Sequence, residues 1–242
     1  MNEKKLALVT GASRGIGRAI AKELNQKGFL VGIHYNSSRE SAEQLLKELG
    51  DGLLIQADLS TIEGCDKVYE EIKNSKLPLE VLVNNAGYVK DNPIFNATLE
   101  EFDQMININM KTVWYLTKRL MRLMIRNRSG RIINISSIIG SIGNPTQSIY
   151  GMTKAAIDNF TKTAAMEMAE YGILVNSVAP GFIDTDMTKN LPEEHKNMIL
   201  SRIPLKRMGT PEEIAQVVGF LATSGTYITG TVIHVNGGMY GG

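Results

Sequence analysis

Short apolar runs alternate with longer amphipathic stretches along the whole chain. Several of the runs are almost wholly apolar over four or more residues, as is typical of strands that helices cover on both faces of a sheet. We predict a strand for each of seven runs: residues 6–11, 29–35, 53–58, 79–85, 131–137, 173–180 and 231–238.

The stretches between these runs carry apolar residues at helical spacing. They predict helices near residues 15–27, 39–49, 62–76, 99–127, 150–170 and 211–222. Alternating strands and helices predict an α/β fold, a Rossmann-type doubly wound parallel sheet of about seven strands. Without a linker or an internal repeat, residues 1–242 are expected to form a single domain. Only the stretch near 184–209 breaks the alternation, and we interpret this insertion as a lid over the substrate.

Composition excludes several classes of function. The net charge is +1, so no overall field favours nucleic acid or an anionic membrane. No apolar run reaches the about 18 residues of a membrane span, and the start of the chain lacks a secretory signal, which favours a cytoplasmic enzyme. Cys65 is the single cysteine, and His34, His195 and His234 lack metal-ligand spacing, so no metal site is expected.

A glycine-rich turn, "TGASRGIG" at residues 10–17, follows the first strand and opens the first helix. Gly11 permits a tight turn, Gly15 a close backbone approach and Gly17 close packing of helix on strand. The N–H groups and the positive end of the helix favour a pyrophosphate there. The spacing departs from G-x-G-x-x-G, but the strand–turn–helix context still predicts a dinucleotide site.

The end of the second strand indicates which dinucleotide. Enzymes that use NAD usually carry an acid there for the ribose hydroxyls, whereas a 2′-phosphate needs cations or neutral donors. Here the strand runs into "HYNSSRE", with no acid before Glu40. The polar loop could also cap the next helix through Ser37 or Ser38, and the two interpretations are compatible. We predict NADPH/NADP+, with three side chains near the phosphate: Arg14, Asn36 and Ser37.

A tyrosine and a lysine four residues apart, in "SIYGMTK", lie on one face of a predicted helix. A free tyrosine has a pKa of about 10, and a neighbouring cation favours the phenolate. Taken alone, Tyr150 and Lys154 could equally belong to an ordinary amphipathic helix.

With these motifs, the chain resembles the short-chain dehydrogenases/reductases over its full length. It shares "TGASRGIG", "NNAG" at residues 84–87, a serine thirteen residues before the Y-x-x-x-K tyrosine, and "VAPGFIDTDM" at residues 178–187. The resemblance implies an oxidoreductase with a nicotinamide cofactor. It assigns four catalytic positions: Asn109, Ser137, Tyr150 and Lys154.

The resemblance also implies a role for each of these residues. Ser137 binds the substrate carbonyl and Tyr150 donates the proton. Lys154 lowers the tyrosine pKa and holds the cofactor ribose. Asn109 bends the central helix and holds a proton-relay water; Asn107 is its nearest competitor for this role, but the family pattern selects the position before "MKTVW". The expected cofactor contacts are Gly11, Ala12, Ser13, Arg14, Gly15, Ile16, Gly17, Asn36, Ser37, Asp58, Leu59, Asn85, Ala86, Gly87, Tyr150, Lys154, Ile183 and Thr185.

Longer stretches narrow the resemblance to the beta-ketoacyl-(acyl-carrier-protein) reductases of fatty-acid synthesis. These include "GRIINISSIIGSIGNPTQSIYGMTKAAI" and the ending "YITGTVIHVNGGMY". The resemblance implies that an acidic acyl carrier protein docks through basic residues beside the cleft, with Arg128 at one docking position. Basic residues at a helix C-terminus also suit the helix dipole. A second docking position, commonly basic, is Tyr171 here.

The resemblance implies a homotetramer in which the helices at 99–127 and 150–170 pair between subunits. Ala155, Ala156, Ala164, Ala165 and Ala169 would allow close packing there, or they pack within the subunit. Two alternatives remain for function: reduction of another ketone, such as a polyketide, CoA ester, sugar or steroid, and a nucleotide-binding protein without catalysis. The intact catalytic set argues against the second.

Overall fold

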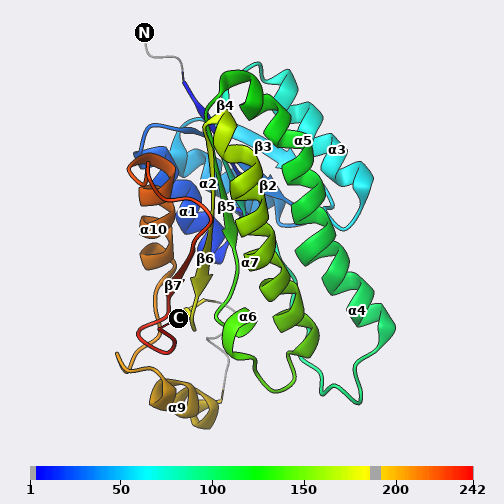
Figure 1. Ribbon diagram of the computed structural model, residues 1–242, viewed down its shortest axis with the longest axis vertical. Coiled ribbons are helices and arrows are strands. Elements are labelled where there is room, and N and C mark those ends of the chain that lie inside the picture. Colours follow the sequence, from blue (N-terminus) through cyan, green and yellow to red (C-terminus); the bar gives the residue numbers. More distant parts are fainter. Residues whose placement is uncertain (1–3, 186–191, 242) are drawn as a thin grey trace.

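A seven-stranded parallel sheet forms the centre of the molecule (Figure 1). The structure is a computed structural model that describes residues 4–185 and 192–241. The strand order is β3-β2-β1-β4-β5-β6-β7, which is the predicted doubly wound arrangement. All seven predicted strands are present, with small differences at their ends: β1 (Leu6–Val9), β2 (Leu30–Tyr35), β3 (Gly52–Gln56), β4 (Leu79–Asn84), β5 (Gly130–Ile135), β6 (Ile173–Pro180) and β7 (Val232–Val235).

Helices cover both faces of the sheet (Figure 1). One face carries α1 (Gly15–Gln26), α2 (Arg39–Leu49) and α10 (Pro211–Thr223). The other carries α3 (Ile62–Asn74), α5 (Thr112–Asn127) and α7 (Ser148–Met168). Strand β1 explains why the strand runs are apolar throughout. Its Ala7 and Val9 join the first core, and Leu6 and Leu8 join the second, because successive side chains point to opposite faces.

The predicted helix at 99–127 is interrupted. α4 (Leu99–Ile106) passes into a π-helical turn, η1 (Asn107–Lys111), before α5 begins at Thr112. A π turn holds one residue more than an α turn and is frequent at functional sites. Asn109, the residue at which the resemblance implies a bend, lies in this turn.

Other predicted helices form with modified ends. α7 begins at Ser148, two residues earlier than predicted, and continues into a 3-10 turn, η2 (Ala169–Tyr171). A short helix that the sequence analysis did not predict, α6 (Ile139–Ile142), follows β5.

The insertion near 184–209 contains a helix, α9 (Glu193–Arg202), whose first turn is acidic and exposed. Part of the predicted lid, residues 186–191, lies outside the described residues. The lid therefore stays a prediction.

A chain of four buried polar residues ties the middle of the sheet to the helices above it. The Asn84 amide of β4 donates to the Thr117 hydroxyl at 3.0 Å and to the Asn134 side-chain oxygen at 2.8 Å. Asn134 of β5 in turn donates to the Thr161 hydroxyl of α7 at 2.9 Å. Buried polar groups cost several kcal/mol when unpaired, so this satisfied chain fixes how α5 and α7 sit on the sheet.

Candidate active site

The four predicted catalytic residues come together beyond the carboxyl ends of β4 and β5. Ser137 follows β5, Tyr150 and Lys154 lie in the first turns of α7, and Asn109 lies in η1. Asn109 is 1% exposed, Lys154 5% and Ser137 9%, while Tyr150 is half-buried. Ligands of open α/β sheets bind at this edge, so the position fits a catalytic role.

Asn109 is held in a buried network with the segment after β4. Its Oδ1 accepts the Tyr88 N–H at 2.8 Å, and its Nδ2 donates to the Tyr88 carbonyl at 2.8 Å and to the Thr153 hydroxyl at 3.2 Å. Both amide hydrogens are therefore used within the protein. A Cβ placed on Gly87 would lie 3.5 Å from Asn109 Oδ1 and 3.7 Å from Lys154 Nζ, so the end of "NNAG" adjoins both residues.

Lys154 is a buried cation whose hydrogen bonds are only partly used. Its Nζ donates to the Ile135 carbonyl at 2.8 Å and lies 5.6 Å from the centroid of the Tyr150 ring. Burial lowers the pKa of Lys154 to about 8, and the nearby Asp158 carboxylate opposes this shift. An ammonium has three donors, so further hydrogen bonds from this side chain are available to a ligand.

The expected lowering of the tyrosine pKa is not found in this arrangement. Burial raises the pKa of the Tyr150 phenol, a hydrogen bond from Ser137 opposes the shift, and the charge of Asp91 adds to it. Lys154 approaches the ring rather than standing against the hydroxyl, which explains why burial dominates. At neutral pH the phenol is thus protonated, which is the form that can donate a proton.

The glycine turn has the features of an anion site. Gly11 has φ +63°, which favours glycine, and a Cβ on Gly17 would lie 2.3 Å from the Gly11 carbonyl oxygen. Helix α1 begins at Gly15 without an acid in its first turn, and its N-cap residue Arg14 makes no side-chain capping bond to the described residues. The first N–H groups of α1 therefore point out of the helix end, where they can donate to an anion. A Cβ on Gly15 would lie 3.9 Å from Thr185 Cγ2, which brings Thr185 to the same place.

Thr10 supports this turn and was not among the predicted site residues. Its hydroxyl accepts the N–H groups of Asn85 and Ala86, both at 2.9 Å. The Asn85 amide donates back to the Thr10 carbonyl at 2.8 Å and to the Gly11 carbonyl at 3.1 Å. Asn85 therefore braces the turn from behind. The signal was available, because Thr10 opens the quoted motif "TGASRGIG".

His34 is a second supporting residue to which the sequence analysis gave no role. The Gly11 N–H donates to its Nδ1 at 3.0 Å, and its Nε2 lies 3.1 Å from the Ala57 carbonyl oxygen. These partners define a neutral ring with its hydrogen on Nε2. Burial lowers the pKa of His34 to about 4. The ring thus links the glycine turn to the end of β3.

The predicted adenosine end is open to solvent. A hollow of about 540 Å³ there is lined by Asn36, Gln56, Ala57, Asp58, Thr61, Glu63, Gly64 and Lys67. Of the predicted contacts, Asn36 and Asp58 line it, whereas Leu59 is buried behind it. Arg14 and Ser37 are exposed. Lys67 was not predicted, and nothing in the sequence distinguished it from other surface lysines.

Ser38 and Arg39, at the end of the loop after β2, have defined places in the structure. Arg39 Nε donates to Glu43 at 2.7 Å on the surface of α2, so its charge is already paired. Ser38 occupies the N-cap of α2, but its side chain makes no capping hydrogen bond to the described residues. Ser38 thus holds the predicted N-cap position without a side-chain capping bond.

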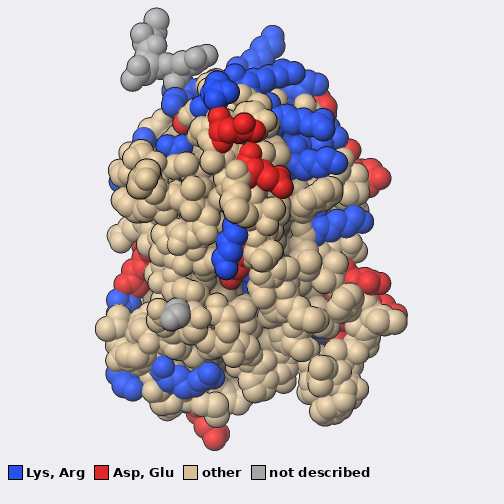
Figure 2. Space-filling view, viewed as in Figure 1, with Lys and Arg blue, Asp and Glu red and all other residues tan. Residues whose placement is uncertain are grey.

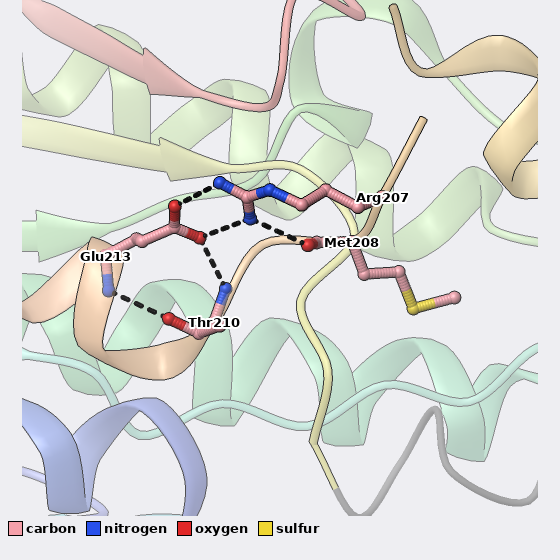
Figure 3. Close-up of polar contacts among 4 residues, drawn as sticks. All are labelled: Arg207, Met208, Thr210 and Glu213. Atoms are coloured by element: carbon pink, nitrogen blue, oxygen red, sulfur yellow. Dashed lines mark hydrogen bonds and ion pairs between the residues drawn. The ribbon is translucent and has the colours of Figure 1, made fainter. Parts of the chain in front are cut away.

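The segment after β6 carries the remaining predicted contacts. Ile183 is buried and forms a β-bridge with Gly209. Beside Gly209, Arg207 and Glu213 form an ion pair with an Nη2–Oε1 distance of 2.5 Å (Figure 3). The pKa of Glu213 is lowered to about 2, first by the hydrogen bond from Arg207 and then by the Thr210 N–H.

This fold and site define a class: a dinucleotide-binding protein with a Ser–Tyr–Lys set at the carboxyl edge of its sheet. Comparison with known proteins agrees. The family model described as enoyl-(acyl carrier protein) reductase matches residues 11–240. A protein of Staphylococcus aureus is 45% identical over 245 residues, covering 99% of this chain and 100% of the relative. One of Haemophilus influenzae is 46% identical over 238 residues, covering 98% of each.

A protein of Vibrio harveyi is 42% identical over 240 residues, again covering 98% of each chain. All three relatives are named 3-oxoacyl-(acyl-carrier-protein) reductase. The chain belongs to the short-chain dehydrogenase/reductase family, as the sequence motifs indicated. It is thus an oxidoreductase of a family that uses a nicotinamide cofactor.

None of the described helices is long and apolar enough to cross a membrane. Across residues 4–185 and 192–241, no three His, Cys, Asp or Glu side chains are grouped so that they could hold a metal ion.

Proposed function

We propose that this enzyme reduces 3-oxoacyl thioesters carried on acyl carrier protein to 3-hydroxyacyl thioesters in fatty-acid synthesis, with NADPH as reductant. The observation that carries the substrate assignment is the match over the full length to relatives named for this reaction. The assembly of Ser137, Tyr150, Lys154 and Asn109 at one edge of the sheet supports the chemistry.

Each side chain has a defined task in this proposal. The nicotinamide, when bound, supplies a hydride to the ketone carbon. The hydroxyls of Ser137 and Tyr150 donate hydrogen bonds to the ketone oxygen, where negative charge develops. Tyr150, protonated at neutral pH, transfers its proton to that oxygen. Lys154 uses its remaining donors to hold the ribose, while the Ile135 carbonyl keeps its Nζ in place.

Asn109 acts through position in this scheme. Its two amide hydrogens are donated to the Tyr88 carbonyl and the Thr153 hydroxyl. A relay water at this site would therefore donate to the remaining lone pair of Asn109 Oδ1. The π turn and the Tyr88 contacts hold that oxygen near Lys154, as the position of Gly87 between them indicates.

The preference for NADPH rests on exposed residues at the adenosine end. Arg14 is the N-cap of α1 and has no carboxylate partner among the described residues. Arg39, by contrast, is paired with Glu43. A 2′-phosphate beside Arg14 would gain a charge-assisted hydrogen bond, and the loop after β2 presents no acid before Glu40.

The expected position of Arg128, beside the cleft of its own chain, does not agree with the structure. Tyr150 lies in the first turn of α7, while Arg128 Nη2 donates to the Glu170 carbonyl at 2.6 Å, just beyond the other end of this helix. A 21-residue helix is about 30 Å long, so within one chain Arg128 is not beside the cleft. Figure 2 shows Lys and Arg side chains gathered over α3 and the C-terminal part of α5.

We therefore propose that Arg128 serves a cleft of a second subunit, through antiparallel pairing of α5 and α7 in a homotetramer. Large apolar side chains on both helices are exposed and suit such pairing: Trp114, Met152 and Met166. Of the alanines predicted to line this contact, Ala155 and Ala169 are exposed, whereas Ala164 and Ala165 are buried within the subunit. Light scattering at micromolar concentration should give the tetramer mass; a monomer would contradict the proposal.

The function is tested by NADPH oxidation with one acyl chain presented in three forms: on acyl carrier protein, on CoA and as a small ketone. We expect the carrier-bound form to have the highest kcat/KM. Equal or better turnover of the free ketone would favour another ketone as the substrate. A protein that binds NADPH without oxidising it would favour a non-catalytic role.

The docking role of Arg128 can be tested in the same assay. Arg128 has φ +48°, so Arg128→Asn is a suitable variant because asparagine tolerates left-handed backbone. We expect its KM to rise about 3- to 10-fold for the carrier-bound substrate and to stay unchanged for the CoA form. Lys73→Ala, which removes an exposed ion pair on α3, is the control. Equal effects on both substrates would contradict docking at Arg128.

A further inference from the structure

Three residues just before and within the start of α10 form a compact polar cluster, which we call the α10 anchor: Arg207, Thr210 and Glu213 (Figure 3). Arg207 holds both carboxylate oxygens of Glu213, with Nη1–Oε2 at 2.9 Å and Nη2–Oε1 at 2.5 Å. Its Nη1 also donates to the Met208 carbonyl at 3.1 Å. A forked guanidinium–carboxylate pair fixes direction as well as distance.

The anchor includes more than a helix cap. The Glu213 carboxylate accepts the Thr210 N–H at 2.8 Å, and the Thr210 hydroxyl accepts the Glu213 N–H at 3.3 Å, which completes a capping box. The same box occurs at α4, between Thr98 and Glu101, but there Asn92 donates to the carboxylate, and no Lys or Arg of the described residues forms an ion pair with it. A capping box alone does not need an arginine, so Arg207 has a further role.

One end of the anchor is attached to the segment that follows β6. The Asp184 N–H donates to the Gly209 carbonyl at 2.8 Å, and the Gly209 N–H donates to the Phe182 carbonyl at 3.0 Å. A Cβ on Gly209 would lie 2.8 Å from Ile183 Cδ1 and 3.5 Å from Glu213 Oε2. Gly209 is thus enclosed between the Ile183 side chain and the anchor.

The other end is fixed to the core beneath the glycine turn. In α10, Ile214 and Val218 are fully buried in the same hydrophobic core as Ile20 and Leu24 of α1. A Cβ on Gly219 would meet Glu23 of α1 at 2.6 Å, so the two helices are in close contact. The anchor therefore connects α1, which begins at the glycine turn, to the segment at Ile183.

We propose that the α10 anchor is a positioning element for the nicotinamide half of the cofactor: Arg207 and Glu213 hold Gly209, and through the Gly209–Ile183 bridge they set the place of Ile183 and Thr185. This inference rests on the proposed function and on the cofactor contacts that the family resemblance implies at Ile183 and Thr185, which we place at the nicotinamide carboxamide and the pyrophosphate. It assigns no contact between the anchor and the cofactor itself. Weakening the anchor should therefore affect one half of the dinucleotide and leave the other half unchanged.

Two ligands separate the halves: NADPH, and adenosine 2′,5′-bisphosphate, which lacks the nicotinamide. The main variant is Glu213→Gln, which keeps an oxygen for the Thr210 N–H but removes the charge that holds Arg207. We expect its Kd for NADPH, measured by fluorescence, to rise about 3- to 10-fold, because charge-assisted hydrogen bonds are lost from a partly exposed pair. The Kd for the bisphosphate should change less than twofold.

Further variants distinguish positioning from simple stabilisation. Arg207→Lys should recover part of the NADPH affinity that Arg207→Ala loses, since it keeps the charge but not the fork. Glu101→Gln, at the matching capping box of α4, should leave both affinities unchanged. Arg207→Lys and Glu101→Gln are both measured with the same two ligands. The comparison therefore depends on the two dissociation constants and not on the melting temperature of a variant.

Each outcome has a defined meaning. Equal weakening of both ligands in Glu213→Gln and Arg207→Ala would make the anchor a purely structural element and overturn the inference. Unchanged NADPH affinity in both variants would overturn it as well. A wild-type protein that fails to bind NADPH, or that binds it without reducing a ketone, contradicts the proposed function instead. These outcomes are read from the wild type, so they are distinct from a change seen only in the variants.

Discussion

The catalytic edge and the adenosine end of the site are built in opposite ways. The catalytic edge is buried at three residues: Asn109, Ser137 and Lys154. The Asn109 amide donates to the Tyr88 carbonyl, and the Lys154 ammonium donates to the Ile135 carbonyl. Arg14 and Asn36 are exposed on the surface. In the proposed function, catalytic geometry thus follows from folding of the core, whereas the choice between NADPH and NADH depends on surface side chains that can change without disturbing the fold.

The largest effect is expected at the catalytic edge, with Tyr150→Phe. The variant keeps the ring and its position beside Lys154 but has no proton to give. General acid catalysis typically contributes about 100-fold or more, so kcat should fall at least 100-fold while the Kd for NADPH changes little. Stopped-flow reduction and NADPH fluorescence measure the two quantities. Near-normal turnover would remove Tyr150 from the catalytic set.

A smaller and selective effect is expected at the adenosine end, with Arg14→Ala. One charge-assisted hydrogen bond contributes roughly 1.5–3 kcal/mol, which corresponds to about a 10- to 100-fold preference for NADPH over NADH. The variant should lose this preference through weaker NADPH binding, with the Kd for NADH nearly unchanged. An equal loss for both cofactors would make Arg14 a structural residue, and equal use of both by the wild type would overturn the choice of cofactor.

The smallest effect concerns His34, the buried residue that accepts the Gly11 N–H of the glycine turn. Its pKa is about 4 in the folded protein against an ordinary 6.5, so the unfolded chain takes up this proton first as the pH falls. Stability present above pH 6.5 is therefore lost between 6.5 and 4, by about 2 kcal/mol between pH 7 and pH 5.

His34→Asn keeps an acceptor for the Gly11 N–H but does not titrate. Its free energy of unfolding in urea should therefore decrease about 2 kcal/mol less than that of the wild type over the same pH range. His195→Asn, on the exposed side of α9, is the control. Parallel pH profiles for His34→Asn and the wild type would mean that the buried ring does not resist protonation.

The fold was predictable because its signals are local. Apolar runs such as residues 6–9 and 81–83 are buried on both faces, and the strand order follows from the family motifs and the alternation of elements. The π turn at 107–111 was not predicted as such. Its sequence, "NINMK", has no composition that separates a π turn from an α turn, and the hydrogen bonds of Asn109 with Tyr88 join positions 21 residues apart, which local patterns do not show.

The candidate site was predictable where a motif names the residue, and less so where a neighbour decides its role. Tyr150 and Lys154 adjoin as expected, but the tyrosine pKa depends on burial, which spacing does not show. His34 acts through backbone partners far along the chain, so sequence patterns could not reveal it, whereas Thr10 belongs to the quoted glycine motif and its support of the turn could have been inferred. The sequence analysis expected Arg128 beside the cleft. Its distance from Tyr150 depends on which end of α7 it adjoins, and sequence patterns do not show this.

The buried chain Thr117–Asn84–Asn134–Thr161 has a consequence for how such sequences diverge. Replacing one member by an apolar residue leaves a partner unsatisfied, which costs about 1–3 kcal/mol, whereas replacing a bonded pair together can be nearly neutral. Single steps along this route are therefore selected against. Across an alignment of relatives these four positions, which lie on four different elements, should covary, and a substitution at one should be found mainly in sequences already altered at its partner.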